Sequence, residues 1–143
     1  QRLFLRCENS NIHFLIDTGS DVSILPNSLL QRRNRTNHPL MAANGNTITT
    51  YGKRTTAVHL PNLPTYEWTF TVADVKTAIL GADFLNHHGL LVDLKNNRLI
   101  DTTDTAIATP RGTTGNTTAP KEPYCSVVTI DSRSKQLLDT NKP

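Results

Sequence analysis

Residues 14–25 read FLIDTGSDVSIL. Three apolar residues precede Asp17, and the run over residues 22–25 is apolar apart from one serine, with β-branched Val22 and Ile24. Gly19 permits a sharp turn between the two runs, because glycine adopts backbone conformations that a Cβ obstructs. The pattern predicts two buried strands joined by a tight turn that holds a carboxylate.

Two further patterns occur downstream. Residues 43–46 read ANGN, and an Asn-Gly pair favours the positive φ values of a hairpin turn. The flanking residues 40–41 and 47–49 are the expected arms of this hairpin. Residues 78–85 read AILGADFL, an apolar run that ends at a glycine and continues into a short helix.

Together these patterns resemble the retropepsins, which are retroviral-type aspartic proteases. The resemblance is closest to the protease segment of gypsy-type long-terminal-repeat retrotransposon polyproteins. It rests on residues 14–26, 43–48, 51–52, 79–85 and 89–94. These stretches follow one another in the order that the family uses, and they span about the first hundred residues.

The resemblance implies an all-β fold, a small closed barrel of the retropepsin type with one short C-terminal helix, active as a homodimer. The residue pattern itself predicts many short strands between turns rich in Gly, Asn and Pro. Helices are predicted over residues 26–31 and 82–88, and Gly89 is expected to end the second. Strands are predicted over residues 2–6, 11–16, 22–25, 47–51, 54–60, 68–72, 77–80, 90–94 and 98–101.

The composition divides the chain into two parts. Residues 1–101 are predicted to form the protease domain, and residues 102–143 a Thr/Pro-rich linker or tail that is largely irregular. Eight of the nineteen residues from 102 to 120 are Thr, so little apolar surface is available there to offset the ordering entropy. Residues 125–130 are the best candidate for a further strand. The polar ends of the chain, with no initial Met, favour a piece excised from a longer polypeptide.

The Asp-Thr-Gly word occurs once in the 143 residues. Peptide hydrolysis without a metal or a nucleophilic side chain needs an activated water and a proton donor, and two carboxylates in contact supply both. Two like charges so close cannot both persist, so the pair keeps one proton and divides the roles of acid and base. The single copy therefore predicts a homodimer, with Asp17 of each chain at the two-fold axis.

The predicted catalytic residues are Asp17, Thr18, Gly19 and Ser20. The resemblance implies that Thr18 hydrogen-bonds across the two-fold axis to its counterpart. Many retroviral relatives carry Ala in place of Ser20, and we expect the Ser20 hydroxyl to donate to the outer oxygen of Asp17 and to favour the ionised pair. On this expectation, Ser20→Ala moves the activity optimum to higher pH.

The resemblance assigns substrate binding to the flap, a hairpin that closes over the substrate and excludes water. Retroviral enzymes pair the residue at Asp21 with an Arg of the second helix, but Ala82 occupies that helical position here. The salt bridge is therefore missing. The predicted substrate-binding residues are Asp21, Ala43, Asn44, Gly45 and Asn46.

Dimerisation has a physical rationale in the size of the predicted domain. A barrel of about a hundred residues is marginal alone, and pairing two copies removes exposed strand edges. In the family, the chain termini interleave into an interface sheet. Residues 3–5 are the first candidate for such a strand here, and residues 98–100 or the tail are the second.

The bulk properties disfavour other classes of protein. The formal net charge is +3 and residues 32–35 are the one dense basic cluster, so no direct nucleic-acid partner is expected. Cys7 and Cys125 are too few for a disulfide framework or a zinc site, and no metal or cofactor is expected. No apolar run reaches the length of a membrane span, so no membrane partner is expected. The expected location is cytoplasmic, within virus-like particles where the family forms them.

The preferred function is that of an aspartic-type endopeptidase that processes its own retrotransposon polyprotein. Two alternatives stay open. One is a cellular retropepsin-like protease recruited from such an element, with protein substrates in trans. The other is a catalytically idle member of the fold that serves as a dimeric peptide-binding module. A reverse transcriptase encoded downstream would favour the retrotransposon protease over the cellular alternative.

Overall fold

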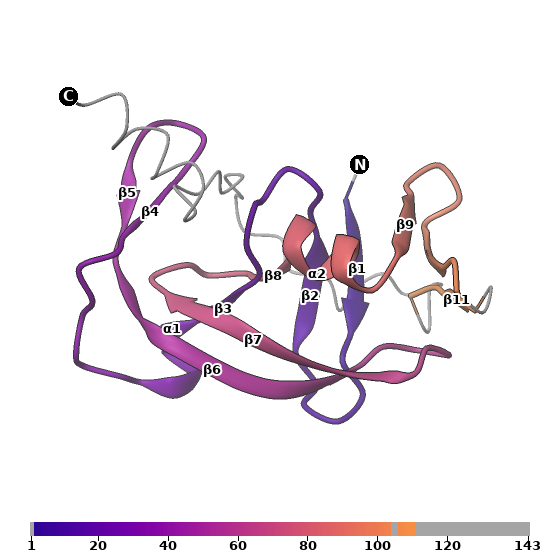
Figure 1. Cartoon of the computed structure of the whole chain (residues 1–143), viewed down its shortest axis with the longest axis horizontal. Coiled ribbons are helices and arrows are strands. Elements are labelled where there is room, and N and C mark those ends of the chain that lie inside the picture. The colour runs from indigo at the N-terminus through magenta and orange to yellow at the C-terminus, as the bar shows by residue number, and fades with distance from the viewer. Residues whose placement is uncertain (1, 104–105, 111–143) are drawn as a thin grey trace.

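The computed structural model describes residues 2–103 and 106–110. Its largest element is a six-stranded sheet with the order β1-β2-β8-β3-β7-β6 (Figure 1). A mostly β fold is therefore confirmed. The six strands are β1 (Leu3–Arg6), β2 (His13–Ile16), β8 (Ala78–Leu80), β3 (Ile24–Pro26), β7 (Thr65–Ala73) and β6 (Thr50–His59).

Two parallel pairings in this sheet bring distant segments together. β2 pairs with β8, and β3 pairs with β7. Parallel neighbours require a crossover, so these pairs join parts of the chain that are far apart in sequence. β3 and β8 are buried along their whole length, which fits their continuous apolar runs. As a result, the end of β2, the start of β3 and the end of β8 lie next to one another, at the same end of these three strands.

β6 and β7 form a long antiparallel hairpin at the far edge of the sheet. The sequence predicts separate strands over residues 47–51 and 54–60, but β6 runs continuously from Thr50 to His59. Its pairing with β7 is irregular between Thr50 and Lys53, where Gly52 has φ of 93°. The positive φ bends the strand without ending it, which explains the difference from the prediction.

The main core is formed largely by side chains of the six-stranded sheet and of α2 (Ala82–His87). Phe14 and Phe70 stack with ring centroids 5.5 Å apart, and Phe84 of α2 is fully buried. Leu3 and Leu5 of β1 also belong to this core, whereas Phe4 is half-buried. Burying each such side chain stabilises the fold by about 1.5–3 kcal/mol. Two of the three residues in the candidate interface segment 3–5 are thus buried in the core of their own subunit.

A separate three-stranded sheet has the order β11-β10-β9, built from β11 (Ile107–Ala108), β10 (Arg98–Asp101) and β9 (Leu90–Asp93). One face of this sheet packs on the main core through Leu90, Leu99 and Ala108. β11 lies beyond the predicted domain boundary at residue 101, so strand structure continues further than the pattern indicates. A strand of two residues is too short to give a period-two signal.

The opposite face of the three-stranded sheet carries three aligned apolar residues. Ile100 is the register partner of Leu91 on one side and of Ile107 on the other. Leu91 is 57 % exposed and Ile107 is 38 % exposed. We call Leu91, Ile100 and Ile107 the outer row.

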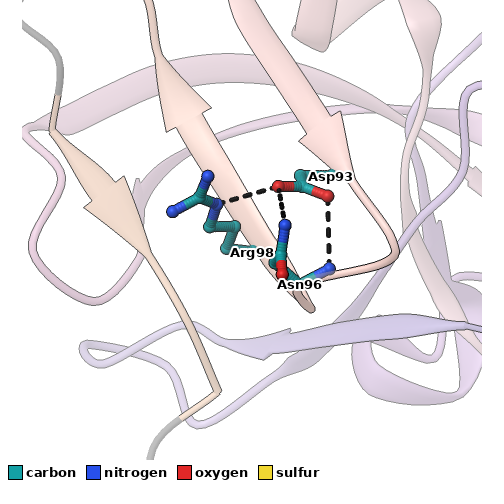
Figure 2. Close-up of polar contacts among 3 residues, drawn as sticks. All are labelled: Asp93, Asn96 and Arg98. Carbon is teal, nitrogen blue, oxygen red and sulfur yellow. Dashed lines mark hydrogen bonds and ion pairs between the residues drawn. The ribbon is translucent and has the colours of Figure 1, made fainter.

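Asp93 fixes the turn between β9 and β10 (Figure 2). It accepts hydrogen bonds from the Asn96 backbone N–H at 3.2 Å and from the Asn96 side-chain amide at 2.9 Å. The Arg98 Nε also lies 2.9 Å from Asp93 Oδ2. The hydrogen bonds from Asn96, followed by that from the Arg98 guanidinium, lower the pKa of Asp93 below its usual range.

The remaining described elements are short. α1 (Asn27–Leu30) is a single turn within the helix predicted over residues 26–31, and α2 matches the helix predicted over residues 82–88. β4 (Leu40–Met41) and β5 (Thr47–Ile48) form a two-stranded sheet. Closure of the sheets into a barrel stays a prediction.

The division into a domain over residues 1–101 and a tail over residues 102–143 also stays a prediction. Most of that tail, including the candidate strand over residues 125–130, lies outside the described residues.

Candidate active site

Asp17 follows β2 directly, at the end of the strands where β2, β8 and β3 lie next to one another. Its backbone N–H donates to Leu80 O at 3.0 Å, which continues the parallel pairing of Ile16 with Leu80 by one residue. The carboxylate is therefore carried by a backbone that is anchored to a fully buried strand. Asp17 itself is half-buried, while the next two residues, Thr18 and Gly19, are exposed.

The turn after Asp17 is closed by its own hydrogen bonds. Gly19 N–H donates to Asp17 Oδ1 at 2.9 Å, and Ser20 N–H donates to Asp17 O at 3.1 Å. A Cβ added at Gly19 would lie 3.2 Å from Asp17 Oδ1, which is tighter than most real contacts. Glycine at this position thus leaves room for the carboxylate to stay over the turn.

Ser20 does not donate to Asp17, contrary to the expectation from the sequence. Its hydroxyl donates to Val22 O at 2.8 Å, and the side chain is fully buried. A hydroxyl has a single proton to donate, and here the turn directs it towards the strand that follows. The predicted shift of the activity optimum in Ser20→Ala therefore loses its basis. The role of Ser20 supported by this geometry is to hold the shape of the turn.

Gly81, at the end of β8, packs directly against the turn. A Cβ added there would lie 2.6 Å from both Ser20 O and Val22 O, a distance at which backbone would have to move. The neighbouring Ala82 N–H donates to Ser20 O at 2.7 Å. The glycine is therefore required by the close approach of two backbone segments, one of which carries Asp17.

Ser23 and Asp83 connect the same two segments through side chains. Asp83 accepts a hydrogen bond from the Ser23 N–H at 3.1 Å and one from the Ser23 hydroxyl at 2.7 Å. The Ser23 hydroxyl oxygen in turn accepts from Gly81 N–H at 2.9 Å. Asp83 also accepts from the Phe84 N–H at 2.7 Å, so one carboxylate ties the start of α2 to the start of β3.

Neither Asp83 nor Ser23 is among the site residues predicted from the sequence. No local pattern joins two residues that are sixty positions apart. The available signal was their position, because Ser23 comes shortly after Gly19 and Asp83 shortly after Gly81, and each glycine follows a largely buried strand.

The predicted flap turn is present as a hairpin between β4 and β5. Leu40 pairs with Ile48, and Met41 pairs with Thr47. The hairpin is closed by hydrogen bonds from Ala42 N–H to Asn46 O at 2.8 Å and from Gly45 N–H to Ala42 O at 2.9 Å. The four predicted substrate-binding residues of the turn are exposed, namely Ala43, Asn44, Gly45 and Asn46.

Gly45 has φ of 90° with no atom near its missing Cβ, so conformation rather than space selects glycine there. Asp21, the other predicted substrate-binding residue, lies directly after the turn that carries Asp17 and is half-buried.

A small apolar cluster lies between the flap hairpin and the strands that carry the turn. Its buried members are Ile24 of β3, Leu40 of β4, Ala73 of β7 and Ile79 of β8. The partly buried residues that pack against it are Val22, Ile48 and Val75. The cluster joins both arms of the hairpin to the segment after Asp17, so the hairpin and the carboxylate share one apolar support.

Within residues 2–103 and 106–110, no group of three or more His, Cys, Asp or Glu side chains is arranged to hold a metal ion. Across the same described part of the chain, no helix is long and apolar enough to cross a membrane.

A family model and solved structures relate the chain to known proteins. No curated protein matches its sequence. The retroviral protease-like domain of Ddi1 from Leishmania major matches in structure with a TM-score of 0.56 and 20 % identity, over 78 % of this chain and 94 % of that one. The EIAV protease in complex with the inhibitor HBY-793 matches with a TM-score of 0.49 and 19 % identity, over 65 % of this chain and 91 % of that one.

The Ddi1 match shows a retroviral protease-like fold. The family model described as "gag-polyprotein putative aspartyl protease" matches residues 5–87, which is more than half of the 143 residues and includes Asp17, the flap hairpin and α2. The retropepsin resemblance is thereby confirmed, and the chain belongs to this family of gag-polyprotein aspartyl proteases.

Proposed function

We propose that the chain is an aspartic endopeptidase that acts as a homodimer, with water activated between two Asp17 carboxylates. The observation that carries the proposal is the Asp17 turn. One carboxylate stands on a turn that is anchored to buried strands, next to two exposed residues. A second carboxylate of this geometry can come only from a second copy of the turn, because the chain contains the Asp-Thr-Gly word once.

In the proposed reaction, one Asp17 carboxylate takes a proton from the bound water while the water oxygen attacks the carbonyl carbon of the scissile amide. The protonated partner carboxyl donates a hydrogen bond to the carbonyl oxygen. The proton taken from the water then passes from the first carboxyl to the leaving nitrogen as the C–N bond breaks. This division of roles needs one proton shared between two carboxylates. The buried anchors of each turn would fix the separation of the pair, which is the main requirement for such catalysis.

The flap hairpin supports a role in closing over a polypeptide. Its exposed turn residues offer backbone and amide groups, and its arms rest on the apolar cluster around Ile24 and Ile79. In Figure 1 the connection between β2 and β3, the β4–β5 hairpin and the turn after β9 all point to the same side of the molecule. We place the substrate and the second copy on this side.

The outer row is our candidate for the dimer contact. Leu91 and Ile107 are exposed apolar residues in register with Ile100 on the three-stranded sheet. Burying such a row against a second copy removes apolar surface from water at about 25 cal/mol per Å². The segment over residues 3–5 contributes less, since Leu3 and Leu5 already face the core of their own subunit.

The proposed substrate is the polyprotein from which the chain itself derives, as the gag-polyprotein description of its family suggests. A retrotransposon origin and a location within virus-like particles are parts of the same proposal.

The test uses the purified chain, a polyprotein substrate and mildly acidic buffer, with and without pepstatin. We expect site-specific cleavage that pepstatin inhibits and that Asp17→Asn abolishes, while the circular dichroism spectrum of the variant stays unchanged. Cleavage retained by Asp17→Asn would exclude the mechanism. A folded, dimeric wild-type protein that binds peptides and never cleaves them would support the idle module instead.

A further inference from the structure

The middle of the chain has an uneven distribution of charge. From Val22 to Tyr66 the sequence contains five cationic residues and no Asp or Glu. The five fall into two groups that are about twenty residues apart, and they are Arg32, Arg33, Arg35, Lys53 and Arg54.

The fold brings the two groups together through Arg32. Its Nη1 donates to Lys53 O at 2.8 Å and to Tyr51 O at 3.3 Å. Asn27 holds the backbone of Arg32, donating to its carbonyl at 2.8 Å and accepting from its N–H at 2.9 Å. A Cβ on Gly52 would lie 3.3 Å from Arg32 Nη1, so the loop and β6 are in close contact.

A second set of hydrogen bonds fixes the rest of the loop to β6. Thr36 N–H donates to Thr50 O at 2.9 Å, the hydroxyls of these two residues are hydrogen-bonded, and the Thr50 hydroxyl reaches His38 O at 2.9 Å. The loop from Arg32 to His38 is therefore held along the first residues of β6. Four exposed cations stand on this loop and on the part of β6 that it follows, namely Arg33, Arg35, Lys53 and Arg54. We call these four residues the basic surface.

Few anionic groups balance the basic surface within the described residues. The ion pairs found there join Glu8 to His59 and Asp93 to Arg98, and both lie elsewhere. Asp74 is linked to the basic surface through Tyr51. The Tyr51 hydroxyl donates to Asp74 Oδ2 at 2.9 Å, and Arg35 also interacts with Tyr51. One carboxylate against four cations leaves a net positive surface.

The basic surface lies at the root of the flap hairpin. The loop over residues 32–38 leads into β4, and β5 leads into the start of β6, so both arms of the hairpin begin or end at this surface. Lys53 is five residues beyond Ile48, a distance of about 16 Å along an extended strand. A polypeptide lying under the flap could reach the basic surface with a few further residues.

We propose that the basic surface binds an acidic segment of the polypeptide substrate that flanks the cleavage site. This inference rests on the proposed function and adds a substrate class to it. Complementary charge at the rim of a binding site raises the rate of association and selects partners. A substrate with Asp or Glu residues a short distance from the scissile bond is therefore bound in preference to one with neutral flanks.

The surface fits a peptide better than a single-stranded nucleic acid. Nucleic-acid channels of this kind add aromatic side chains on which bases stack. Tyr51 is the aromatic residue at the basic surface, and it is half-buried with its hydroxyl bonded to Asp74.

The test measures binding separately from cleavage. Asp17→Asn protein is titrated into a fluorescent Glu-rich peptide, a matched Gln-rich peptide and a single-stranded RNA of equal charge, by fluorescence anisotropy. We expect the Glu-rich peptide to bind most tightly. Its binding should weaken as salt is raised, since exposed charges are screened. The reversals Arg33→Glu and Arg54→Glu together should weaken this binding on the order of tenfold. Lys95→Glu, which reverses an exposed cation on the β9–β10 turn, should leave it unchanged.

Equal weakening by Lys95→Glu, no weakening by the double reversal, or tighter binding of the RNA would each overturn the proposal. With the active wild type, kcat/KM is compared for two substrates that differ only in acidic or neutral flanks. Cleavage of both at equal rates would overturn the inference alone. Cleavage of neither, with peptide binding intact, would overturn the proposed function and leave the basic surface as a binding site.

Discussion

Ser23 Oγ lies 2.7 Å from Asp83 Oδ1, across sixty residues of the chain. Because Ser23 begins the buried segment after the Asp17 turn and Asp83 stands in the first turn of α2, this hydrogen bond joins the two segments that enclose the turn. The position of Asp17 therefore depends on contacts that do not involve Asp17 itself.

Replacing Ser23 with Ala should destabilise the fold. The change removes the hydroxyl that Asp83 and Gly81 share and leaves the partly buried Asp83 carboxylate and the buried Gly81 N–H without that partner. The expected loss in the free energy of unfolding is about 1–3 kcal/mol, measured by urea denaturation. Ser28→Ala, at an exposed serine of α1, is the matched control and should change stability little. Equal effects of the two substitutions would contradict the proposed support.

Gly81→Ala should distort the Asp17 turn. The new Cβ would stand 2.6 Å from the carbonyl oxygens of Ser20 and Val22, so the backbone must shift. Overpacking of this kind costs about 1–3 kcal/mol, and we expect cleavage to fall further than stability does. Gly45→Ala is the contrasting variant, since it meets no neighbouring atom and strains only the flap turn. Full activity in Gly81→Ala would show that the close approach is not needed.

Acid should weaken the fold through His88. This ring packs against Tyr66, Trp68 and Phe84, and its Nε2 is buried with no hydrogen-bond partner among the described residues. Burial, with a smaller effect of neighbouring His87, lowers the pKa of His88 from its usual 6.5, while Asp101 opposes the shift.

The folded protein therefore binds this proton less tightly than the unfolded chain does. The contribution of neutral His88 is complete above the unfolded value of 6.5 and is lost as pH falls through the lower folded pKa. We expect His88→Gln to lose less thermal stability than the wild type between about pH 7.5 and about pH 5. Parallel declines of the two proteins would assign the acid sensitivity to other groups.

Leu91→Asp should dissociate the proposed dimer without unfolding the subunit. Leu91 is 57 % exposed in the single chain, so a charge costs little there, but it would be buried in a contact through the outer row. Sedimentation velocity should show a shift from dimer to monomer, with loss of cleavage at low protein concentration. Leu29→Asp, at a residue of α1 that is 55 % exposed, should leave the dimer intact. A dimer unaffected by Leu91→Asp would place the interface elsewhere.

The sequence predicts several of the strands well, because continuous apolar runs between turn residues are a strong signal. β10 matches the predicted residues 98–101, and β8 differs from its prediction only at Thr77. β2 begins at His13 rather than at Asn11, because Asn11 has φ of 61° and ends the preceding turn.

Side-chain partners were harder to predict than strands. A hydroxyl donates to whichever acceptor the backbone presents, so the sequence could not show that Ser20 faces Val22 O rather than Asp17. The Ser23–Asp83 bond arises because β8 lies between β2 and β3 in the sheet, and β11 is a strand only because β10 offers it an edge. Each of these features depends on tertiary contacts that local pattern does not contain.

The central claim is that two copies of Asp17 form one active site, and mixed dimers test it most directly. Wild-type protein is unfolded and refolded with a roughly ninefold excess of Asp17→Asn, at a concentration where dimers form, so that about one wild-type chain in ten meets another wild-type chain. We predict that cleavage per wild-type chain falls to about a tenth of its value without the variant. Cleavage per wild-type chain that stays constant at every ratio would contradict the claim, because each Asp17 would then act without its counterpart.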